Sequence, residues 1–512
     1  MTTPRAVTPA IATSAIATPD SIAASLHADA PGLDPANWAD FTSVAHRAVD
    51  DMAHHLSALR DQPVWQQMPP SVKETFTTGI PHAGVGDAAA YEDFTTNVLP
   101  YPGGNLHPRF WGWVMGTGVP SAMVADFLAA GINPNCGGLE QAPGLVEAQV
   151  LSWMGELLLD DATASGVFVS SASVANLVAL TAALHARAGF DIRADGLQGA
   201  PYKLACYGSV ETHSWIKRTC SVLGLGESAF RAIPTTADFR IDVPKLRESI
   251  RADRANGVRP FCVIGTAGTV NTGATDDLSA LASVCAEEEL WFHVDGAFGA
   301  MARLSPTLKP MFAGIERADS LAFDLHKWGY LPYGIAAVLV RDARAHLSPF
   351  TTTPSYLQTM PRGPMTSGVT YGDRGLDLSR GFLALKAWFT LKSHGVDAVM
   401  RNIEGNVAQA HYLGRLVNAA ADLELLAPVS LNLVTFRYVP VDREPLGEEA
   451  LDALNVEILL RLQERGIAVP SSSRVNGKYA LRVAITNHRT RFADLDTLIT
   501  FVQRIGVEIL AE

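Results

Sequence analysis

Six short runs of apolar residues recur between about residue 110 and residue 390, separated by longer stretches with helical periodicity. Each run lacks polar alternation, as expected for strands that are buried on both faces of a sheet. A mostly parallel α/β sheet buries its strands in this way, so this part of the chain is predicted to have an α/β fold. The runs are residues 167–169, 204–207, 261–264, 291–294, 321–323 and 335–340.

Composition and periodicity divide the chain into four segments. Residues 1–30 are rich in Ala and Thr and interrupted by proline, which predicts a disordered tail rather than a signal peptide. Residues 31–108 contain an amphipathic helix over 38–60 followed by Pro- and Gly-rich turns, so we expect an arm that wraps around the body. The large sheet domain is predicted for 109–395, and a small C-terminal α+β domain for 396–512. Its expected elements are a strand at 433–438, a helix at about 448–465, a strand at 479–485 and a closing helix from residue 492.

Charge and cysteine content narrow the possible partners. The chain has 40 Lys and Arg against 52 Asp and Glu, a net charge of −12, which argues against a nucleic-acid partner. No uncharged stretch has the composition of a membrane span, so no membrane partner is expected. The five cysteines form no CxxC motif and no Cys/His metal spacing. We therefore expect reduced thiols, no metal site and a cytoplasmic location.

Polar residues follow three of the expected strands, at the sheet edge where ligands of α/β proteins bind. Ser171, Ala172 and Ser173 enter a helix, and free amides with small hydroxyl residues at such a point bind anions such as phosphate. Asp295 ends one strand, and Lys327 follows another. Taken alone, the segment 171–173 is also typical of a helix cap, Asp295 of a structural carboxylate and Lys327 of a surface lysine. Together they are the anchors that pyridoxal 5′-phosphate (PLP) requires.

Six ordered motifs give the chain a family resemblance over roughly residues 40–510. It resembles the group II PLP-dependent decarboxylases, which include aromatic-L-amino-acid and glutamate decarboxylases. This resemblance implies the type I (aspartate aminotransferase-like) PLP fold, with a seven-stranded sheet, and a homodimer with active sites at the interface. The motifs are residues 107–110 (HPRF), 171–180, 211–214, 268–276, 293–299 and 326–328 (HKW).

The resemblance also implies roles for individual residues. Lys327 would form the aldimine with PLP, and decarboxylation to the amine and CO2 would pass through a quinonoid intermediate. Asp295 would pair with the pyridinium nitrogen, and His213 and Ala297 would pack on the two ring faces. Tyr356 would act in proton transfer from a loop. The implied phosphate ligands are Ser171, Ala172 and Ser173, with Thr269 and His326 close to the cofactor.

Two departures from the family bear on mechanism and substrate. Asp324 precedes His326-Lys327 where animal enzymes have Asn, and a carboxylate is not expected to bind a phosphate. Arg109 would suit an acidic substrate, whereas Phe110, Trp111 and Trp113 would line a flat apolar pocket for an aromatic one.

We expect an aromatic L-amino acid as substrate, because Trp111-Gly112-Trp113 lacks the Asn-Gln that follows this motif in glutamate decarboxylases. Three alternatives stay open. They are an acidic amino acid decarboxylase, an aldehyde synthase, against which Tyr356 in the loop argues, and a non-catalytic PLP-binding homologue.

Overall fold

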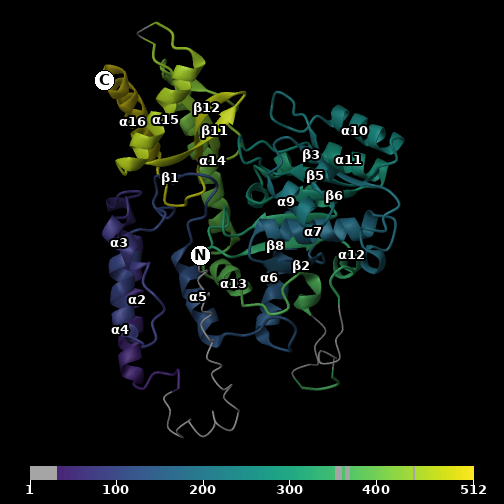
Figure 1. The fold of residues 1–512 in the computed structure, drawn as a ribbon, viewed down its shortest axis with the longest axis horizontal. Coiled ribbons are helices and arrows are strands. Elements are labelled where there is room, and N and C mark those ends of the chain that lie inside the picture. Colours follow the sequence, from purple (N-terminus) through teal and green to yellow (C-terminus); the bar gives the residue numbers. More distant parts are fainter. Residues whose placement is uncertain (1–31, 352–359, 364–369, 442–443) are drawn as a thin grey trace, which may run out of the picture.

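The computed structural model describes residues 32–351, 360–363, 370–441 and 444–512. The expected tail and Tyr356 therefore lie outside the described residues. Figure 1 shows three parts: an arm with α2, α3 and α4 at the left, a large sheet domain at the right, and a smaller domain with α15 and α16 at the top.

The large domain is built on a seven-stranded sheet of order β2-β8-β7-β6-β5-β3-β4. Strand β8 runs antiparallel to both of its neighbours, β2 and β7, and the other neighbouring strands of this sheet are parallel. The mostly parallel sheet predicted from the six apolar runs is confirmed, because each run lies in one of its strands. The strands are β2 (Ser165–Val169), β3 (Leu204–Ser209), β4 (Phe230–Ile233), β5 (Arg259–Thr266), β6 (Trp291–Asp295), β7 (Ser320–Asp324) and β8 (Ala336–Val340).

Helices cover both faces of this sheet. Helix α7 contacts five of the strands as well as α9 and α12 on one face, while α6, α10 and α11 lie over the other. Every residue of β2, β6, β7 and β8 is buried, which explains their continuous apolar sequence. The helices are α5 (Pro120–Ile132), α6 (Ala142–Leu159), α7 (Ala172–Arg187), α8 (Ile192–Asp195), α9 (Trp215–Val222), α10 (Val243–Ala255), α11 (Leu278–Glu288), α12 (Ala343–Leu347) and α13 (Ala384–His394).

The smaller domain is a five-stranded sheet of order β1-β11-β12-β10-β9 covered by helices. Its first strand, β1 (Phe110–Trp111), comes from the other end of the chain and pairs in parallel with β11, so the expected boundary at residue 109 falls just before a strand of this sheet. Helix α14 packs its first half into the large core and its second half into the small one. The elements are β9 (Leu423–Leu425), β10 (Leu433–Tyr438), β11 (Val469–Val475), β12 (Lys478–Ala484), α14 (Val396–Ala419), α15 (Glu448–Glu464) and α16 (Phe492–Ala511).

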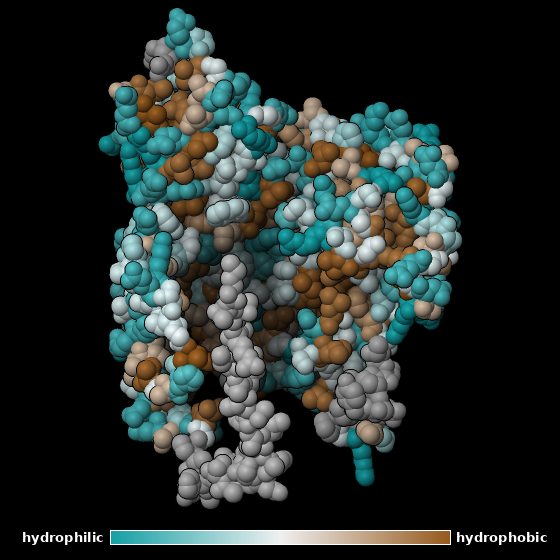
Figure 2. Space-filling view, in the orientation of Figure 1, coloured by the Kyte–Doolittle hydropathy of each residue, from teal (hydrophilic) through white to brown (hydrophobic). Residues whose placement is uncertain are grey.

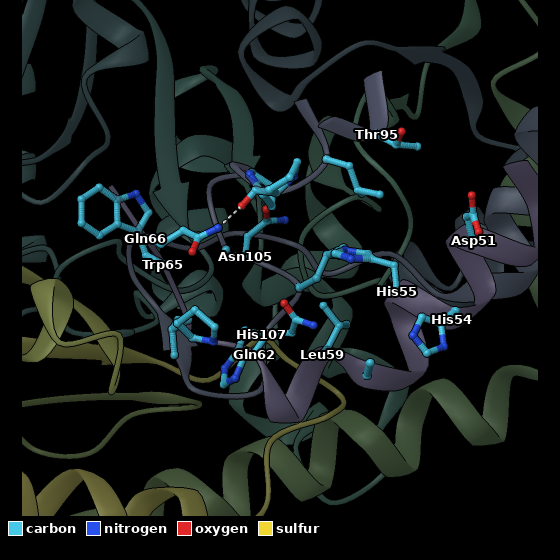
Figure 3. A pocket seen from close by; sticks show the side chains of 18 residues that line it. Asp51, His54, His55, Leu59, Gln62, Trp65, Gln66, Thr95, Asn105 and His107 are labelled. Atoms are coloured by element: carbon cyan, nitrogen blue, oxygen red, sulfur yellow. Dashed lines mark hydrogen bonds between the residues drawn. The ribbon is translucent and has the colours of Figure 1, made fainter. Parts of the chain in front are cut away.

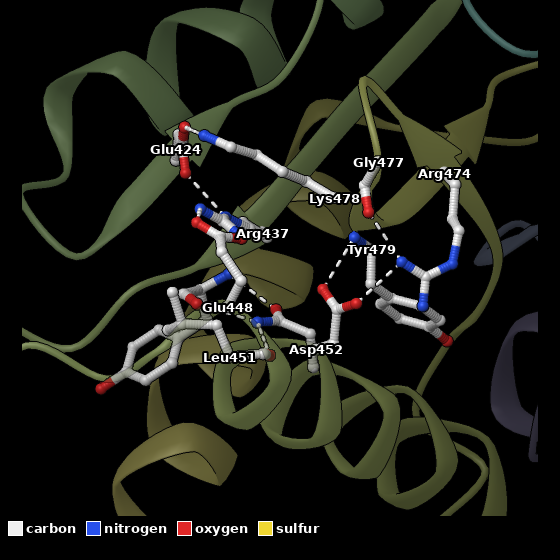
Figure 4. A network of polar contacts seen from close by, with 11 residues as sticks. Glu424, Arg437, Glu448, Leu451, Asp452, Arg474, Gly477, Lys478 and Tyr479 are labelled. Carbon is white, nitrogen blue, oxygen red and sulfur yellow. Dashed lines mark hydrogen bonds and ion pairs between the residues drawn. The ribbon is translucent and has the colours of Figure 1, made fainter.

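A network of ion pairs ties the strands of the small domain to α15 (Figure 4). Arg437 is buried and lies between the carboxylates of Glu424 and Glu448, at 2.6 Å from each. Lys478 contacts the other oxygen of Glu424 at 2.6 Å. The network therefore joins β9, β10, β12 and α15 through charged groups that all have partners.

The arm consists of α2 (Trp38–Ala58), α3 (Pro70–Thr75) and α4 (Asp87–Asp93). Helix α2 agrees with the helix predicted over 38–60, and Asn37 caps it by accepting from the Ala39 N–H. None of its residues is buried within this chain, and Trp38 and Phe41 are exposed. Part of the apolar surface of the arm therefore stays exposed in the described chain.

Candidate active site

A cleft of about 290 Å³ opens at the carboxyl ends of β2, β3, β5, β6 and β7. This is the sheet edge at which the sequence predicted a ligand site, and its size is close to that of small-molecule sites. The predicted site residues that line it are Ser171, Ala172, Ser173, His213, Asp295, Ala297, His326, Lys327 and Trp113. The lining also contains Val114, Asn176, Glu211, Trp215, Thr266, Gly268, Val270, Phe298 and Asp324.

The N-terminus of α7 forms one wall of the cleft. Ser171 is the N-cap residue in an extended conformation, and its side chain makes no capping hydrogen bond. The first helical amide, Ala172 N–H, instead donates to Asp324 Oδ1 at 2.6 Å. Ser173 follows in the first turn, so the helix presents amides and two hydroxyl residues to an anion.

Asp295 ends β6 and is 3% exposed, with a hydrogen-bond donor on each carboxylate oxygen. The indole N–H of Trp215 donates to Oδ2 at 2.6 Å, and the Ala297 N–H donates to Oδ1 at 3.1 Å. Beneath it, His293 is fully buried and bonds to Ser320 and Asn176, and burial lowers its pKa to about 4. His293, Ser320 and Asn176 thus form a neutral, hydrogen-bonded group beneath the Asp295 carboxylate at the cleft floor.

Lys327 lies in the turn after β7, where its Nζ is 2.7 Å from Asp324 Oδ2. The neighbouring His326 donates its Nδ1–H to the Ile335 carbonyl at 3.0 Å, and desolvation lowers its pKa. The segment around Gly116 packs directly on this turn. A Cβ at Gly116 would lie 1.5 Å from the His326 carbonyl oxygen, so only glycine allows this approach.

His213 stands at the open side of the cleft, in the loop between β3 and α9. Its Nδ1 accepts from the Trp215 N–H at 3.3 Å, which fixes the ring relative to the residue that holds Asp295. Desolvation lowers the pKa of His213, and the Asp295 charge acts in the opposite sense. The imidazole is therefore neutral near pH 7.

Trp113 lines the mouth of the cleft with a left-handed backbone, φ 53°, that tryptophan rarely adopts. Buried Arg482 from β12 holds this conformation by donating from Nη1 to the Trp113 carbonyl at 2.8 Å, and it also donates to the Val270 carbonyl. Burial lowers the pKa of Arg482 to about 10. Arg482 was not predicted from the sequence, because its partners come from two distant segments.

Three of the predicted substrate residues are not in the cleft. Trp111 is 1% exposed in the core of the small domain, where its indole N–H bonds to Thr490. Phe110 is packed against Val64, and Arg109 donates to the Ile467 carbonyl. The prediction that these side chains line the substrate pocket is corrected, because pairing of β1 with β11 turns them toward the small domain.

Thr269 is fully buried and does not line the cleft. Its hydroxyl contacts Thr272 at 3.0 Å and accepts from the Ala274 N–H at 3.1 Å. It thereby closes the tight turn that carries Gly268 and Val270 at the cleft wall. Its contribution to the site is to shape this turn.

The residues present fit PLP. The cleft combines a helix N-terminus for a phosphate, a buried acid for a ring nitrogen and a lysine amine for an aldehyde. Two of its buried polar atoms, Asn176 Nδ2 and Thr266 Oγ1, have no hydrogen-bond partner among the described residues, as expected where a polar ligand binds. No group of three or more His, Cys, Asp or Glu side chains in the described ranges is arranged to hold a metal ion.

A second cavity, of about 380 Å³, lies between α2 and residues 62–66 and 99–107 (Figure 3). His54 and His55 come from the helix, and His107 lies in the facing segment. Its lining contains no lysine beside a buried acid and no helix N-terminus. The cleft at the sheet edge is therefore the candidate active site.

Comparison with known proteins agrees with this geometry. Residues 73–439 match the family model of the pyridoxal-dependent decarboxylase conserved domain. The chain belongs to the pyridoxal-dependent decarboxylase family. The resemblance drawn from the six motifs is confirmed, and so are the amino acid decarboxylase class and the PLP cofactor.

Relatives of this pyridoxal-dependent decarboxylase match along nearly their whole length. An aromatic-L-amino-acid decarboxylase from Bacillus atrophaeus is 32% identical over 477 residues, 92% of this chain and 96% of that protein. Tryptophan decarboxylase TDC1 from Camptotheca acuminata is 30% identical, covering 88% of this chain and 91% of its own. The crystal structure of Oryza sativa TDC with PLP and tryptamine has a TM-score of 0.85 at 25% identity, covering 93% of this chain and 100% of that one. The type I fold is confirmed.

Proposed function

We propose that this enzyme decarboxylates an aromatic L-amino acid to the corresponding amine and CO2. The observation that carries the substrate class is the cleft wall, which combines Trp113, Val114 and Phe298 and contains no arginine among the described residues. A flat apolar wall favours an aromatic side chain, whereas a distal carboxylate needs a cationic partner. Arg109, the residue suited to an acidic substrate, bonds to the small domain instead. The names of the relatives support the same class.

The cleft residues divide the chemistry between them. Bound PLP supplies a ring that takes up the electron pair released as the substrate carboxylate leaves as CO2. The α7 N-terminus, with Ser171, Ala172 and Ser173, binds the phosphate. Asp295 keeps a proton on the ring nitrogen, because a buried carboxylate stabilises the cation beside it.

Other residues orient the reacting groups. Trp215 and Ala297 fix both oxygens of Asp295, so the carboxylate cannot rotate away from the ring nitrogen. His213, neutral and open to the cleft, would hold the bound ring and relay a proton at Nε2, since its Nδ1 accepts from the Trp215 amide. Lys327 binds the cofactor through Nζ. The role of Tyr356 in proton transfer stays a prediction from the sequence.

We also propose a homodimer with the cleft near its interface. Figure 2 shows apolar side chains in the hollow between the arm and the body. Helix α5 buries only Ala122 and Ala125 and exposes a row of large apolar residues, and α2 exposes Trp38, Phe41 and Val49. Exposed apolar area of this extent indicates a protein partner, and a second copy is the simplest one. The exposed α5 residues are Val124, Phe127, Leu128 and Ile132.

A cytoplasmic location is proposed from the thiols. All five cysteines are buried and unbridged, and reduced thiols are typical of reducing compartments. Among the described helices, none combines the length and the apolarity that crossing a bilayer requires.

Product analysis tests the proposed function. Purified enzyme with PLP is incubated separately with L-tryptophan, L-tyrosine, L-phenylalanine, L-glutamate and L-aspartate, and products are identified by mass spectrometry. We expect an aromatic amine, and none from Lys327→Ala. An amine from glutamate or aspartate contradicts the substrate class, an aldehyde supports the synthase alternative, and no product from any substrate supports the non-catalytic one.

A further inference from the structure

A buried carboxylate lies between the two parts of the cleft that bind opposite ends of PLP. Asp324 is the last residue of β7 and is 1% exposed. Its Oδ1 accepts from the Ala172 N–H at the α7 N-terminus, at 2.6 Å, and its Oδ2 lies 2.7 Å from Lys327 Nζ. One side chain thus contacts both the proposed phosphate site and the proposed cofactor-binding lysine.

The surroundings leave Lys327 as the main counter-ion of Asp324. The other ion-pairing group within 4.0 Å among the described residues is His326, whose Nε2 is 3.7 Å away. Desolvation lowers the pKa of His326, and its Nδ1–H is already donated to Ile335. The imidazole therefore adds no cation at pH 7, and the carboxylate of Asp324 pairs with the ammonium of Lys327.

This arrangement opposes cofactor binding in two ways. An ammonium has no lone pair and cannot attack an aldehyde. A carboxylate at the Ala172 amide repels the phosphate that the same helix N-terminus would bind. One proton transfer across the 2.7 Å contact removes both obstacles, because it frees the amine and neutralises the acid.

We propose that Asp324 is the base that activates Lys327 for covalent capture of PLP. The proton on Nζ moves to Oδ2, and the nitrogen lone pair attacks the aldehyde carbon. The two hydrogens left on nitrogen depart with the aldehyde oxygen as water, and a carbon–nitrogen double bond forms with no net oxidation or reduction. Asp324 stays as a neutral carboxylic acid whose O–H can donate to the phosphate.

The proposal rests on Lys327 as the cofactor-binding residue, as put forward above. It differs from a purely structural role, in which Asp324 only caps α7. An asparagine keeps an oxygen for the Ala172 N–H and removes the negative charge, but it cannot take up the Nζ proton. The Asp324→Asn variant therefore distinguishes a role of Asp324 as a base from a role as the cap of α7.

The experiment uses the full-length enzyme freed of cofactor. Stopped-flow absorbance follows the visible band that appears as PLP becomes covalently bound, and protein fluorescence measures equilibrium binding of 4-deoxypyridoxine 5′-phosphate, which lacks the aldehyde. The matched control is Asp319→Asn. Asp319 lies at the opposite end of β7, where it accepts from the Phe292 N–H at 2.7 Å.

We expect Asp324→Asn to slow covalent loading by about 10²-fold or more, the usual range for loss of a general base. The same variant should bind the aldehyde-free analogue at least as tightly as the wild type, because a negative charge has left the phosphate site. Asp319→Asn should change neither quantity more than about threefold, as is usual for a change distant from the chemistry.

Two outcomes overturn the proposal. One is loading of Asp324→Asn at the wild-type rate, and the other is weakened analogue binding in proportion to the slower loading, which indicates a structural role. Lys327→Ala identifies a failure of the underlying assignment: it should bind the analogue without gaining the visible band, and a normal band there contradicts the lysine assignment as well.

Discussion

The cleft and the small domain both hold clustered charges, but the buried cation at the centre of the small-domain cluster is an arginine, whereas the cation of the cleft is a lysine. In the small domain, Arg437 lies between Glu424 and Glu448, and Lys478 completes the network (Figure 4). In the cleft, the cation nearest the buried acid is Lys327, which lies 2.7 Å from Asp324. An arginine stays protonated at any physiological pH, whereas a lysine can give up its proton. Arg437 therefore keeps its charge and holds the small domain together, whereas Lys327 can be discharged and react.

The charged groups of the small-domain network are also paired with one another, whereas the cleft holds polar atoms that a ligand can still bind. The small-domain charges contact one another at 2.6 Å. The cleft retains buried polar atoms without partners, Asn176 Nδ2 and Thr266 Oγ1. Unsatisfied buried groups cost stability, and a polar ligand bound in the cleft would supply partners for these two atoms.

We expect the largest effect on kcat when Lys327, the cation of the cleft, is removed. Lys327→Ala should lower kcat by about 10³-fold or more, because the nucleophile that anchors the cofactor is gone. The measurement is amine formation from the preferred substrate together with the visible absorbance of bound PLP. Lys309→Ala, which removes an exposed lysine paired with Asp160, is the control and should keep full activity.

The second largest effect on kcat is expected from replacing Asp295, the carboxylate at the cleft floor. Asp295→Asn should lower kcat by about 10²- to 10³-fold, the scale seen for loss of one electrostatic stabilising group. Asparagine can still accept from Trp215, so the fold should be retained by circular dichroism. Wild-type kcat in this variant would show that the charge at the cleft floor is not used.

The Trp215 hydrogen bond should have a smaller effect. Trp215→Phe removes the 2.6 Å donor to Asp295 and should lower kcat about tenfold, as for one hydrogen bond to a charged group, with little change in KM. The visible band of bound PLP should shift as well, which a merely structural role would not cause. Trp388→Phe, which removes a similar indole bond to Gln149 on the surface, is the control.

The small-domain network should affect stability rather than turnover. The hydrogen bond from Arg437 lowers the pKa of Glu448; burial acts to raise that of Glu424, but the hydrogen bonds from Lys478 and Arg437 lower it overall. Carboxylates with depressed pKa values stabilise the fold above their unfolded pKa, about 4.3, and lose that contribution as pH falls through the folded values.

Arg437→Met should therefore leave kcat at pH 7 unchanged and reduce the acid sensitivity of Tm. Thermal unfolding of both proteins at pH 7 and pH 3.5, the latter set about one unit below the unfolded glutamate pKa, measures this. The Tm difference between wild type and variant should shrink on acidification. A constant difference would show that the network does not couple to these carboxylates.

The sequence was most informative where neighbouring residues decide the structure. The six apolar runs became strands because continuous burial on both faces requires continuous apolar sequence. Lys327, Asp295 and Ser171 reached one cleft because they follow strands of the same sheet. The strand β11 was missed, since Ser471, Ser472 and Ser473 lack the apolar pattern, and edge strand β4 is only partly buried.

Contacts between distant segments could not be predicted in this way. Trp111 looked like a pocket residue until pairing of β1 with β11, over 350 residues along the chain, placed it in the small core. The hydrogen bonds from Trp215 to Asp295 and from Arg482 to the Trp113 carbonyl likewise depend on tertiary packing. Asp324 was not expected to bind the phosphate, and its contacts with the first amide of α7 and with Lys327 also depend on tertiary packing.

The most direct test of the account is the identity of the lysine that binds PLP. The enzyme loaded with PLP is reduced with borohydride, digested and mapped by mass spectrometry. We expect one phosphopyridoxyl group, on the peptide that contains Lys327. Modification of another lysine instead, such as Lys386, which pairs with Asp126, would contradict it.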